Sequence, residues 1–299
     1  MVRFFVFLAL FALASAQDVS FHADTTLVLI PVVVTDPMNR FVLGLEKKDF
    51  HLFEDGTEQT ITHLSNEDAP LSVGLVFDSS GSMSDKLQTS RQAAFRFLTT
   101  MNAEDEVFLV QFSDHAQLVA PFTSHTEEIQ SKLEGIEPGG LTAMLDGAQM
   151  ALAEMQKAKN PRKAIVIISD GGDNNSRYTV AQVESLVREA DVQIYAMGVF
   201  EPSIVIPGLT AEEVSGPRLL SEIAEQTGGR AFSASDPKDL PNVAVRIGIE
   251  LRNQYVLAYS PKNQKRDGKY RRVEVKVNKP AGLADIKVHS RLGYYAPSK

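Results

Sequence analysis

Three oxygen-bearing side chains alternate along one short segment of the chain. Residues 78–83 read Asp-Ser-Ser-Gly-Ser-Met, so the carboxylate of Asp78 is followed by the hydroxyls of Ser80 and Ser82. In an extended loop, side chains two residues apart point to the same side. Oxygen donors without thiolate or imidazole suit a hard divalent cation such as Mg²⁺, with Mn²⁺ and Ca²⁺ as alternatives. The spacing therefore predicts a cation site.

Two further segments offer the oxygens that an octahedral ion still requires. Residues 138–142 read Pro-Gly-Gly-Leu-Thr, a glycine-rich loop that brings the hydroxyl of Thr142 to the start of a predicted helix. Residues 165–173 form an apolar strand that ends in Ser-Asp-Gly, with Asp170 at its carboxyl end. In a doubly wound sheet, loops at the carboxyl ends of the strands lie on one edge. We therefore expect the three loops to converge.

A divalent cation would explain why two carboxylates are placed at the same edge. Two such charges about 5 Å apart repel by roughly 3 kcal/mol at an effective dielectric constant near 20. The ion turns this repulsion into attraction and still accepts an anionic oxygen in an open coordination position. The alternative is that Asp78 and Asp170 only cap strand ends through backbone amides, which leaves the three hydroxyls at the same edge unexplained.

Strand and helix patterns alternate between residues 71 and 251. Strands are expected at 73–77, 107–112, 164–168, 193–199 and 231–232, and helices at 86–101, 127–133, 143–159, 180–190, 218–226 and 239–251. Near-continuous apolar strands that alternate with amphipathic helices predict an α/β fold, a doubly wound, mostly parallel sheet with helices on both faces. Thr142, Thr179 and Asp239 are candidate helix N-caps.

The segments on either side have strand character instead. A β-branched, apolar run occupies 26–35 and an alternating run occupies 272–277. Neither terminal segment is large enough to bury an apolar face alone. The simplest interpretation is that residues 17–70 and 253–299 pair into one small β-sandwich. The α/β domain, at 71–252, would then be inserted between them.

Together, the three loop motifs resemble the metal-ion-dependent adhesion site of von Willebrand factor type A (VWA) domains, over about residues 71–251. The resemblance implies that Asp78, Ser80 and Ser82 are ligands from the first loop, Thr142 from the second and Asp170 from the third. It also implies that some of these bind the ion through water. The last coordination position would then be left for an acidic side chain of a protein partner.

The flanking segments resemble an exported, VWA-related bacterial subfamily common in Acidobacteria. The resemblance rests on Glu-Asp-Gly at 54–56, on 142–146, on Gln-Tyr at 254–255 and on the closing Arg-Leu-Gly-Tyr-Tyr at 291–295. It covers nearly the whole mature chain but implies little about biological role. In VWA domains the last helix slides when ligand binds, and here that helix would run directly into the sandwich at 253–255. A switch between the two domains is therefore a further hypothesis.

Other candidate residues are weaker. Asp146 and Asp173 lie beside the predicted site and would help to hold its ligands, or would simply be a first-turn helix charge and a turn residue. The histidines have no spacing typical of metal ligands. They occur at positions 22, 51, 63, 115, 125 and 289.

We predict a binding protein rather than an enzyme. The chain has no cysteine, no Gly-x-Ser-x-Gly turn and no phosphate-binding Gly-x-x-x-x-Gly-Lys loop. Ser80 also stands where phosphoryl-transfer enzymes of the Asp-x-Asp type need a second aspartate. The leading hypothesis is an exported, adhesion-type module that captures an acidic residue of a partner through the cation. A scaffold with a purely structural cation is the alternative, and a metal-dependent hydrolase is a third.

The composition is that of an ordinary globular chain of 299 residues with a formal net charge of −8. No block of five basic residues occurs, which argues against nucleic-acid binding and against polybasic membrane docking.

Residues 1–16 are expected to be a signal peptide. They carry Arg3, an apolar stretch at 4–13 and Ala-Ser-Ala before the expected mature start at Gln17. The stretch is shorter than the roughly 20 residues that span a bilayer, although an uncleaved anchor is an alternative. We therefore expect a periplasmic or extracellular protein with no integral membrane segment in the mature chain.

Overall fold

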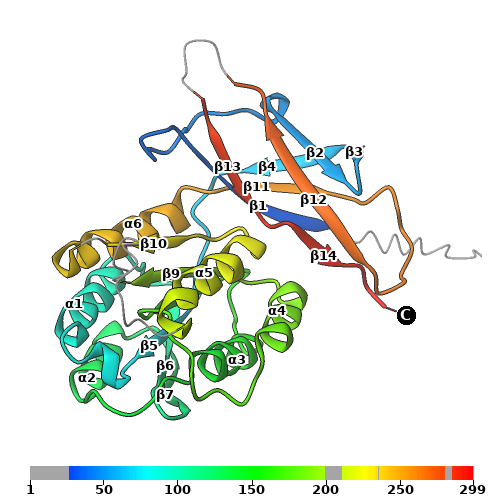
Figure 1. Cartoon of the computed structure of the whole chain (residues 1–299). Helices are drawn as coiled ribbons and strands as arrows, with labels where there is room; N and C mark the ends of the chain where they lie inside the picture. Colours follow the sequence, from blue (N-terminus) through cyan, green and yellow to red (C-terminus); the bar gives the residue numbers. More distant parts are fainter. Residues whose placement is uncertain (1–26, 199–210, 235, 280–284, 299) are drawn as a thin grey trace, which may run out of the picture.

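The chain folds into an α/β domain and an antiparallel β-sandwich that lie side by side (Figure 1). The computed structural model describes residues 27–198, 211–234, 236–279 and 285–298. The predicted signal peptide at 1–16 lies outside these residues. Within the described part of the chain, no helix combines the length and the apolar character needed to cross a bilayer.

The α/β domain is built on a six-stranded sheet with the strand order β10-β9-β8-β5-β6-β7. Its strands are β5 (Leu71–Asp78), β6 (Glu106–Phe112), β7 (Ala116–Thr123), β8 (Arg162–Ile168), β9 (Gln193–Gly198) and β10 (Ala231–Ser233). All neighbours pair in parallel except β6 and β7, which are antiparallel. The mostly parallel sheet is thus confirmed. Strand β7 was not predicted, because this edge strand is only partly buried and contains Pro121.

Six helices of the described chain cover the two faces of the sheet. They are α1 (Leu87–Leu98), α2 (Thr126–Glu134), α3 (Met144–Met155), α4 (Val180–Glu189), α5 (Ala211–Gln226) and α6 (Leu240–Arg252). Buried residues of α1, α2 and α6 pack on one face, and those of α3, α4 and α5 on the other. The helix predicted at 218–226 begins earlier, at Ala211, and includes Pro217, although proline usually interrupts a helix interior.

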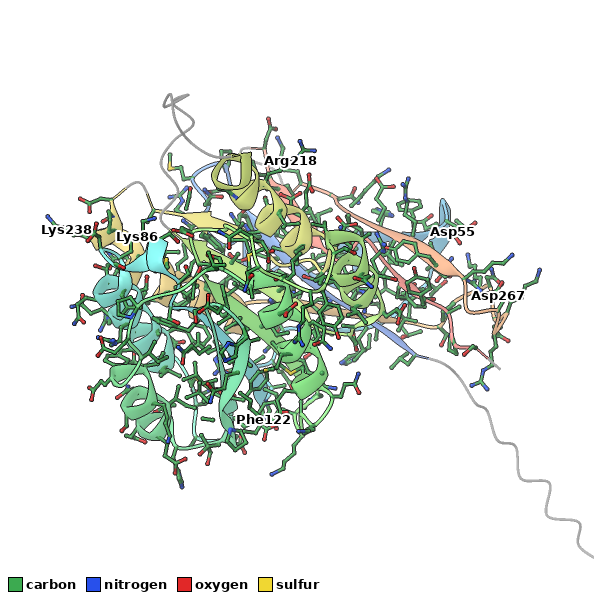
Figure 2. The ribbon with its side chains drawn as sticks, turned by 60° about the horizontal axis from the view of Figure 1, so that its bottom comes forward. Asp55, Lys86, Phe122, Arg218, Lys238 and Asp267 are labelled. Atoms are coloured by element: carbon green, nitrogen blue, oxygen red, sulfur yellow. The ribbon has the colours of Figure 1, made fainter. Side chains whose placement is uncertain are left out.

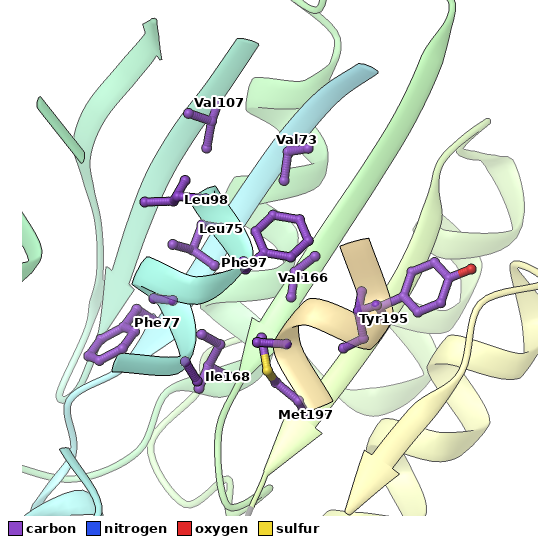
Figure 3. Packing of buried hydrophobic residues seen from close by; sticks show 14 of the residues in the cluster. Val73, Leu75, Phe77, Phe97, Leu98, Val107, Val166, Ile168, Tyr195 and Met197 are labelled. Atoms are coloured by element: carbon purple, nitrogen blue, oxygen red, sulfur yellow. The ribbon is translucent and has the colours of Figure 1, made fainter. Parts of the chain in front are cut away.

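Strand β5 lies at the centre of the sheet and is buried along its whole length. On the face shown in Figure 3, Leu75 and Phe77 of this strand pack in one apolar cluster with Phe97 of α1. A strand covered on both faces must be apolar on both sides, which explains its continuous apolar run. The packing fixes the position of Asp78 at the end of the strand.

Of the three predicted helix N-caps, Thr179 and Asp239 occupy the N-cap position and Thr142 does not. Thr179 does cap α4, accepting a hydrogen bond from the Gln182 amide, as predicted. The N-cap residue of α3 is Ala143 rather than Thr142, and it makes no side-chain cap. Asp239 is the N-cap residue of α6, but it has a helical backbone conformation and its side chain makes no cap bond, because a short 3₁₀ turn already leads into the helix.

The β-sandwich is formed by strands from both ends of the chain. Its strands are β1 (Val28–Thr35), β2 (Phe50–Glu54), β3 (Thr57–Gln59), β4 (Ile61–Ser65), β11 (Tyr255–Tyr259), β12 (Tyr270–Val277), β13 (Lys287–Ser290) and β14 (Gly293–Tyr295). One sheet has the order β13-β1-β11-β4 and the other β14-β12-β2-β3. Both sheets mix N-terminal and C-terminal strands, which confirms the predicted pairing of the terminal segments.

Helix α6 connects the α/β domain to the sandwich, and charged side chains fix this connection. Arg230 forms an ion pair with Glu250 of α6 (Nη1 to Oε2, 2.9 Å) and donates to Asn39 Oδ1 of the sandwich at 3.1 Å. Arg246 of α6 donates to the carbonyl oxygen of Asn39 at 2.7 Å. A sliding α6 would have to break or stretch these bonds. The predicted switch stays a prediction.

Candidate metal centre

The first loop of the site begins where β5 ends. Asp78 is fully buried, and its Oδ1 accepts a hydrogen bond from the Ser80 amide at 2.9 Å. A short 3₁₀ turn follows at Gly81–Met83, and the buried Met83 side chain anchors it. The hydroxyl oxygens of Ser80 and Ser82 lie 3.1 Å apart. The alternating spacing thus brings the two hydroxyls together, as predicted.

The Asp78 carboxylate lacks a positively charged neighbour among the groups that most affect it. Burial raises its pKa to about 6, while hydrogen bonds from Ser169 and Ser80 lower it and the negative charge of Asp170 raises it further. None of these three residues carries a positive charge. A buried carboxylate in such surroundings is costly to ionise, and a divalent cation would compensate its charge.

Backbone hydrogen bonds hold the second loop against the first. The Gly139 amide donates to the carbonyl oxygen of Ser79 at 2.8 Å, and the Gly81 amide donates to that of Gly140 at 3.0 Å. Gly140 has a φ of +80°, and a Cβ there would lie 2.6 Å from the carboxylate of Asp114. Only glycine therefore fits this turn without strain.

The third loop contacts both of the others. The Ser169 hydroxyl donates to Asp78 Oδ2 at 2.6 Å, which joins it to the first loop. The Thr142 amide donates to Asn174 Oδ1, and the Asn174 amide donates back to the carbonyl oxygen of Thr142, both at 2.9 Å. Since each pair of loops is hydrogen-bonded, the structure brings all three together at the carboxyl edge of the sheet. The coordination of an ion by these residues stays a prediction.

Asp170 forms an ion pair that the sequence did not suggest. The Lys86 ammonium donates to Asp170 Oδ2 at 3.0 Å, with side chains only 28% and 14% exposed. Sequence reasoning missed Lys86 because only oxygen ligands were sought. It missed Ser169 as well, although this residue stands directly before Asp170 in the motif.

Asp146 and Asp173 use their carboxylates to fix the third loop on helix α3. Asp146 Oδ1 accepts from the amides of Arg177 and Tyr178 at 2.9 and 3.1 Å, and its Oδ2 accepts from Arg177 Nε at 3.0 Å. Asp173 Oδ2 accepts from the Leu145 amide at 2.8 Å and so takes the capping position expected for Thr142. These bonds shape the site, while a role beside a bound ion stays a prediction.

The chemistry of the donor set fits a hard cation. No group of three or more His, Asp or Glu side chains in the described part of the chain is arranged to hold a metal. The candidate centre instead combines two carboxylates with three hydroxyls. Oxygen donors of this kind suit Mg²⁺, which usually keeps several waters and takes only one or two carboxylates. The residues that would hold the ion are Asp78, Ser80, Ser82, Thr142 and Asp170.

Comparison with known sequences identifies the domain that carries this site. Residues 73–172 match the family description "von Willebrand factor type A domain". The chain contains a VWA domain. This match begins in β5 and ends in the third loop, so it includes all three segments of the candidate centre.

Curated relatives match the chain over part of their own length. An uncharacterized protein of Borreliella burgdorferi is 27% identical over 200 residues, which cover 60% of this chain and 58% of that protein. Inter-alpha-trypsin inhibitor heavy chain H4 of Sus scrofa is 30% identical over 132 residues, 40% of this chain and 14% of that protein. The chain thus spans less than two-thirds of the length of either relative.

A solved structure of a VWA protein from Catenulispora acidiphila has a similar fold. It covers 91% of this chain and 75% of its own, with a TM-score of 0.52 and 13% sequence identity. At this identity the likeness concerns the fold alone. Its coverage extends beyond the α/β domain into the sandwich.

Proposed function

We propose that this protein is an exported, adhesion-type module that binds an acidic residue of a protein partner through a divalent cation. The observation that carries the proposal is the buried Asp78 carboxylate. It lies where three loops meet, and the groups that act on it most strongly include no cation. The presence of a VWA domain supports an adhesion-type role.

Each residue of the centre would have a definite task. Asp78 and Asp170 would neutralise most of the ion's charge, and the hydroxyls of Ser80, Ser82 and Thr142 would complete the protein's share of the ligands. When bound, the cation supplies an electrophilic position that accepts a carboxylate oxygen from outside. The loop-to-loop hydrogen bonds hold the ligands in place, so little conformational entropy is lost on binding.

We propose binding rather than catalysis at this centre. The hydroxyls of Ser80 and Ser82 face each other at 3.1 Å, and no histidine of the described residues donates to or accepts from them. A serine nucleophile needs an adjacent base to become reactive. If the protein were instead a metal-dependent hydrolase, it would turn over phosphoesters, and a chelator would abolish that turnover.

Binding of Mn²⁺ and displacement of its water test the proposal. Water-proton relaxation reports Mn²⁺ that is bound to the protein and still carries exchangeable water. We expect saturable Mn²⁺ binding to the wild type, competed by Mg²⁺, and a loss of at least 100-fold in affinity for Asp78→Ala. A synthetic peptide with one central aspartate should then displace water from the bound Mn²⁺ and lower the relaxivity of the complex. The same peptide with asparagine in that position should not.

The same experiment separates the alternatives. Unchanged Mn²⁺ affinity in Asp78→Ala would reject the centre. Normal metal binding with no difference between the two peptides, together with a melting temperature strongly raised by Mg²⁺, would favour the scaffold with a structural cation. Asp55→Ala is a suitable control, because this carboxylate lies in the exposed β2–β3 turn of the sandwich, on a different domain (Figure 2).

A further inference from the structure

Lys86 places a positive charge of the protein itself at the candidate metal centre. Its ammonium lies 3.0 Å from Asp170 Oδ2, and both side chains are largely shielded from solvent. Lys86 comes from the start of α1 (Figure 2), whereas Asp170 follows β8, so the pair crosses from the first loop to the third. One of the two carboxylates proposed to hold the ion therefore already has a partner.

The backbone around Lys86 holds this residue in place. Its amide donates to the carbonyl oxygen of Met83 at 2.8 Å, and its own carbonyl oxygen accepts from the Ser90 amide at 2.9 Å. Lys86 is thus fixed between the 3₁₀ turn of the metal motif and the first turn of α1. Its side chain is the movable part, because four rotatable bonds separate the backbone from the ammonium.

We propose that Lys86 is an internal counter-ion that competes with the divalent cation for Asp170 and thereby sets the metal affinity of the centre. This inference rests on the proposed function, since it concerns the same site. The ammonium offsets the repulsion between Asp78 and Asp170 when no cation is bound. The lysine would thus keep the three loops assembled and at the same time weaken metal binding.

The competition follows from charge and from geometry. An ion held by Asp170 would need the carboxylate to which Lys86 now donates. If the ammonium stayed, it would lie within a few ångströms of a divalent charge and repel it. If it moved away, the ion pair would be lost. In both cases Lys86 lowers the affinity for the metal relative to a neutral side chain of the same length.

The substitution Lys86→Met tests this inference, with Mg²⁺ and Mn²⁺ alone as the probes in calorimetry. Methionine keeps an unbranched apolar side chain and removes the charge. We expect metal affinity to rise by at least about tenfold, because a like charge is removed from a shielded site. Lys86→Arg keeps the charge and should remain near the wild type. The melting temperature in EDTA should fall for Lys86→Met, and the increase caused by Mg²⁺ should grow.

Lys157→Met is the matched control. Lys157 also pairs with a carboxylate, that of Glu154 at 2.6 Å, but it follows the far end of α3 from the site. The net charge changes by the same amount, so general electrostatics would affect both variants alike. We expect this variant to bind metal within twofold of the wild type.

The outcomes distinguish this inference from the function on which it rests. Equal metal affinities of Lys86→Met and Lys157→Met, with normal binding by the wild type, would overturn the role of Lys86 and leave the metal centre standing. Failure of both the wild type and Lys86→Met to bind metal would overturn both. In the ¹⁵N spectrum of the lysine ammonium groups, Mg²⁺ should shift the Lys86 signal and leave that of Lys157 in place. An unshifted Lys86 signal at saturating Mg²⁺ would also contradict the competition.

Discussion

Asp78 in the α/β domain and Glu54 in the sandwich are both buried carboxylates, but they have different partners. Glu54 Oε2 accepts hydrogen bonds from the hydroxyls of Tyr259 and Tyr294, both at 2.8 Å, and its Oε1 pairs with Arg271 at 3.4 Å. Asp78 accepts from one serine hydroxyl and one amide, and the charged group that most affects it is another carboxylate. The protein therefore gives Glu54 a positively charged partner, whereas the groups that most affect Asp78 include no positive charge.

The cluster around Glu54 stabilises the sandwich. Burial and the bond to Glu54 raise the pKa values of Tyr259 and Tyr294, so both hydroxyls stay protonated and keep donating. Arg271 is only 2% exposed and also donates to the carbonyl oxygens of Asn263 and Lys265. The cluster joins strands of both sheets. A buried carboxylate therefore indicates a binding site only when no positively charged group of the protein pairs with it.

The largest loss of stability is expected for Glu54→Gln. The substitution removes Glu54 as a counter-charge of the buried Arg271, which still pairs with the more exposed Asp267 at 3.3 Å. The loss should lower the free energy of unfolding by about 3 kcal/mol. Urea denaturation at pH 7 measures the loss. Mn²⁺ affinity, measured below the unfolding transition, should stay within twofold of the wild type. A variant that keeps its stability but loses metal binding would reverse the roles assigned to the two carboxylates.

The pH dependence of stability should reveal the raised pKa of Asp78. Its folded pKa of about 6 lies above the ordinary value of 3.8, so the folded protein binds more protons than the unfolded chain between about pH 4 and 6. Stability should therefore fall as the pH rises through this window, by at most about 3 kcal/mol from this group. Unfolding by urea in EDTA, compared with Asp78→Asn, isolates the contribution.

Saturating Mg²⁺ should change the sign of this pH dependence. An ion held by Asp78 would bind only the ionised carboxylate, so the stabilisation by Mg²⁺ should increase as the pH rises from about 5 to 7. Glu54→Gln should retain the same profile, since the neighbours of Asp78 are unchanged. Identical profiles for the wild type and Asp78→Asn in EDTA would show that Asp78 is compensated within the protein after all.

A smaller effect is expected for Thr142→Val, which removes one hydroxyl from the proposed ligand set and keeps the shape of the side chain. Metal affinity should fall by about tenfold, or about 1.4 kcal/mol, since four protein ligands remain. The backbone bonds between Thr142 and Asn174 do not involve the hydroxyl, so the loops should stay in place. Calorimetry with Mg²⁺ measures the change. An unaltered affinity would remove Thr142 from the ligand set without affecting Asp78.

Much of the fold could be predicted because the relevant patterns are local. The continuous apolar run of β5 predicted burial on both faces. The alternation of valine with charged residues in β12 predicted a half-buried strand, and its burial does alternate. Strand β7 was not predicted, because it lies at the edge of the sheet, is partly exposed and shows no clear alternation of buried and exposed residues. The pairing of the two terminal segments was predicted because neither could bury its apolar face alone.

The amino-acid sequence by itself determined the alternating oxygens at 78–82, their place after a buried strand and the order of the three loop motifs. Only the tertiary structure decided which groups share the site. The bond from Ser169 to Asp78 spans 91 residues, the cap from Asp173 to α3 crosses 28, and the pairing of Lys86 with Asp170 crosses 84. The physical reason is that hydrogen bonds and charge pairing depend on distance in space, and separation along the chain does not encode it.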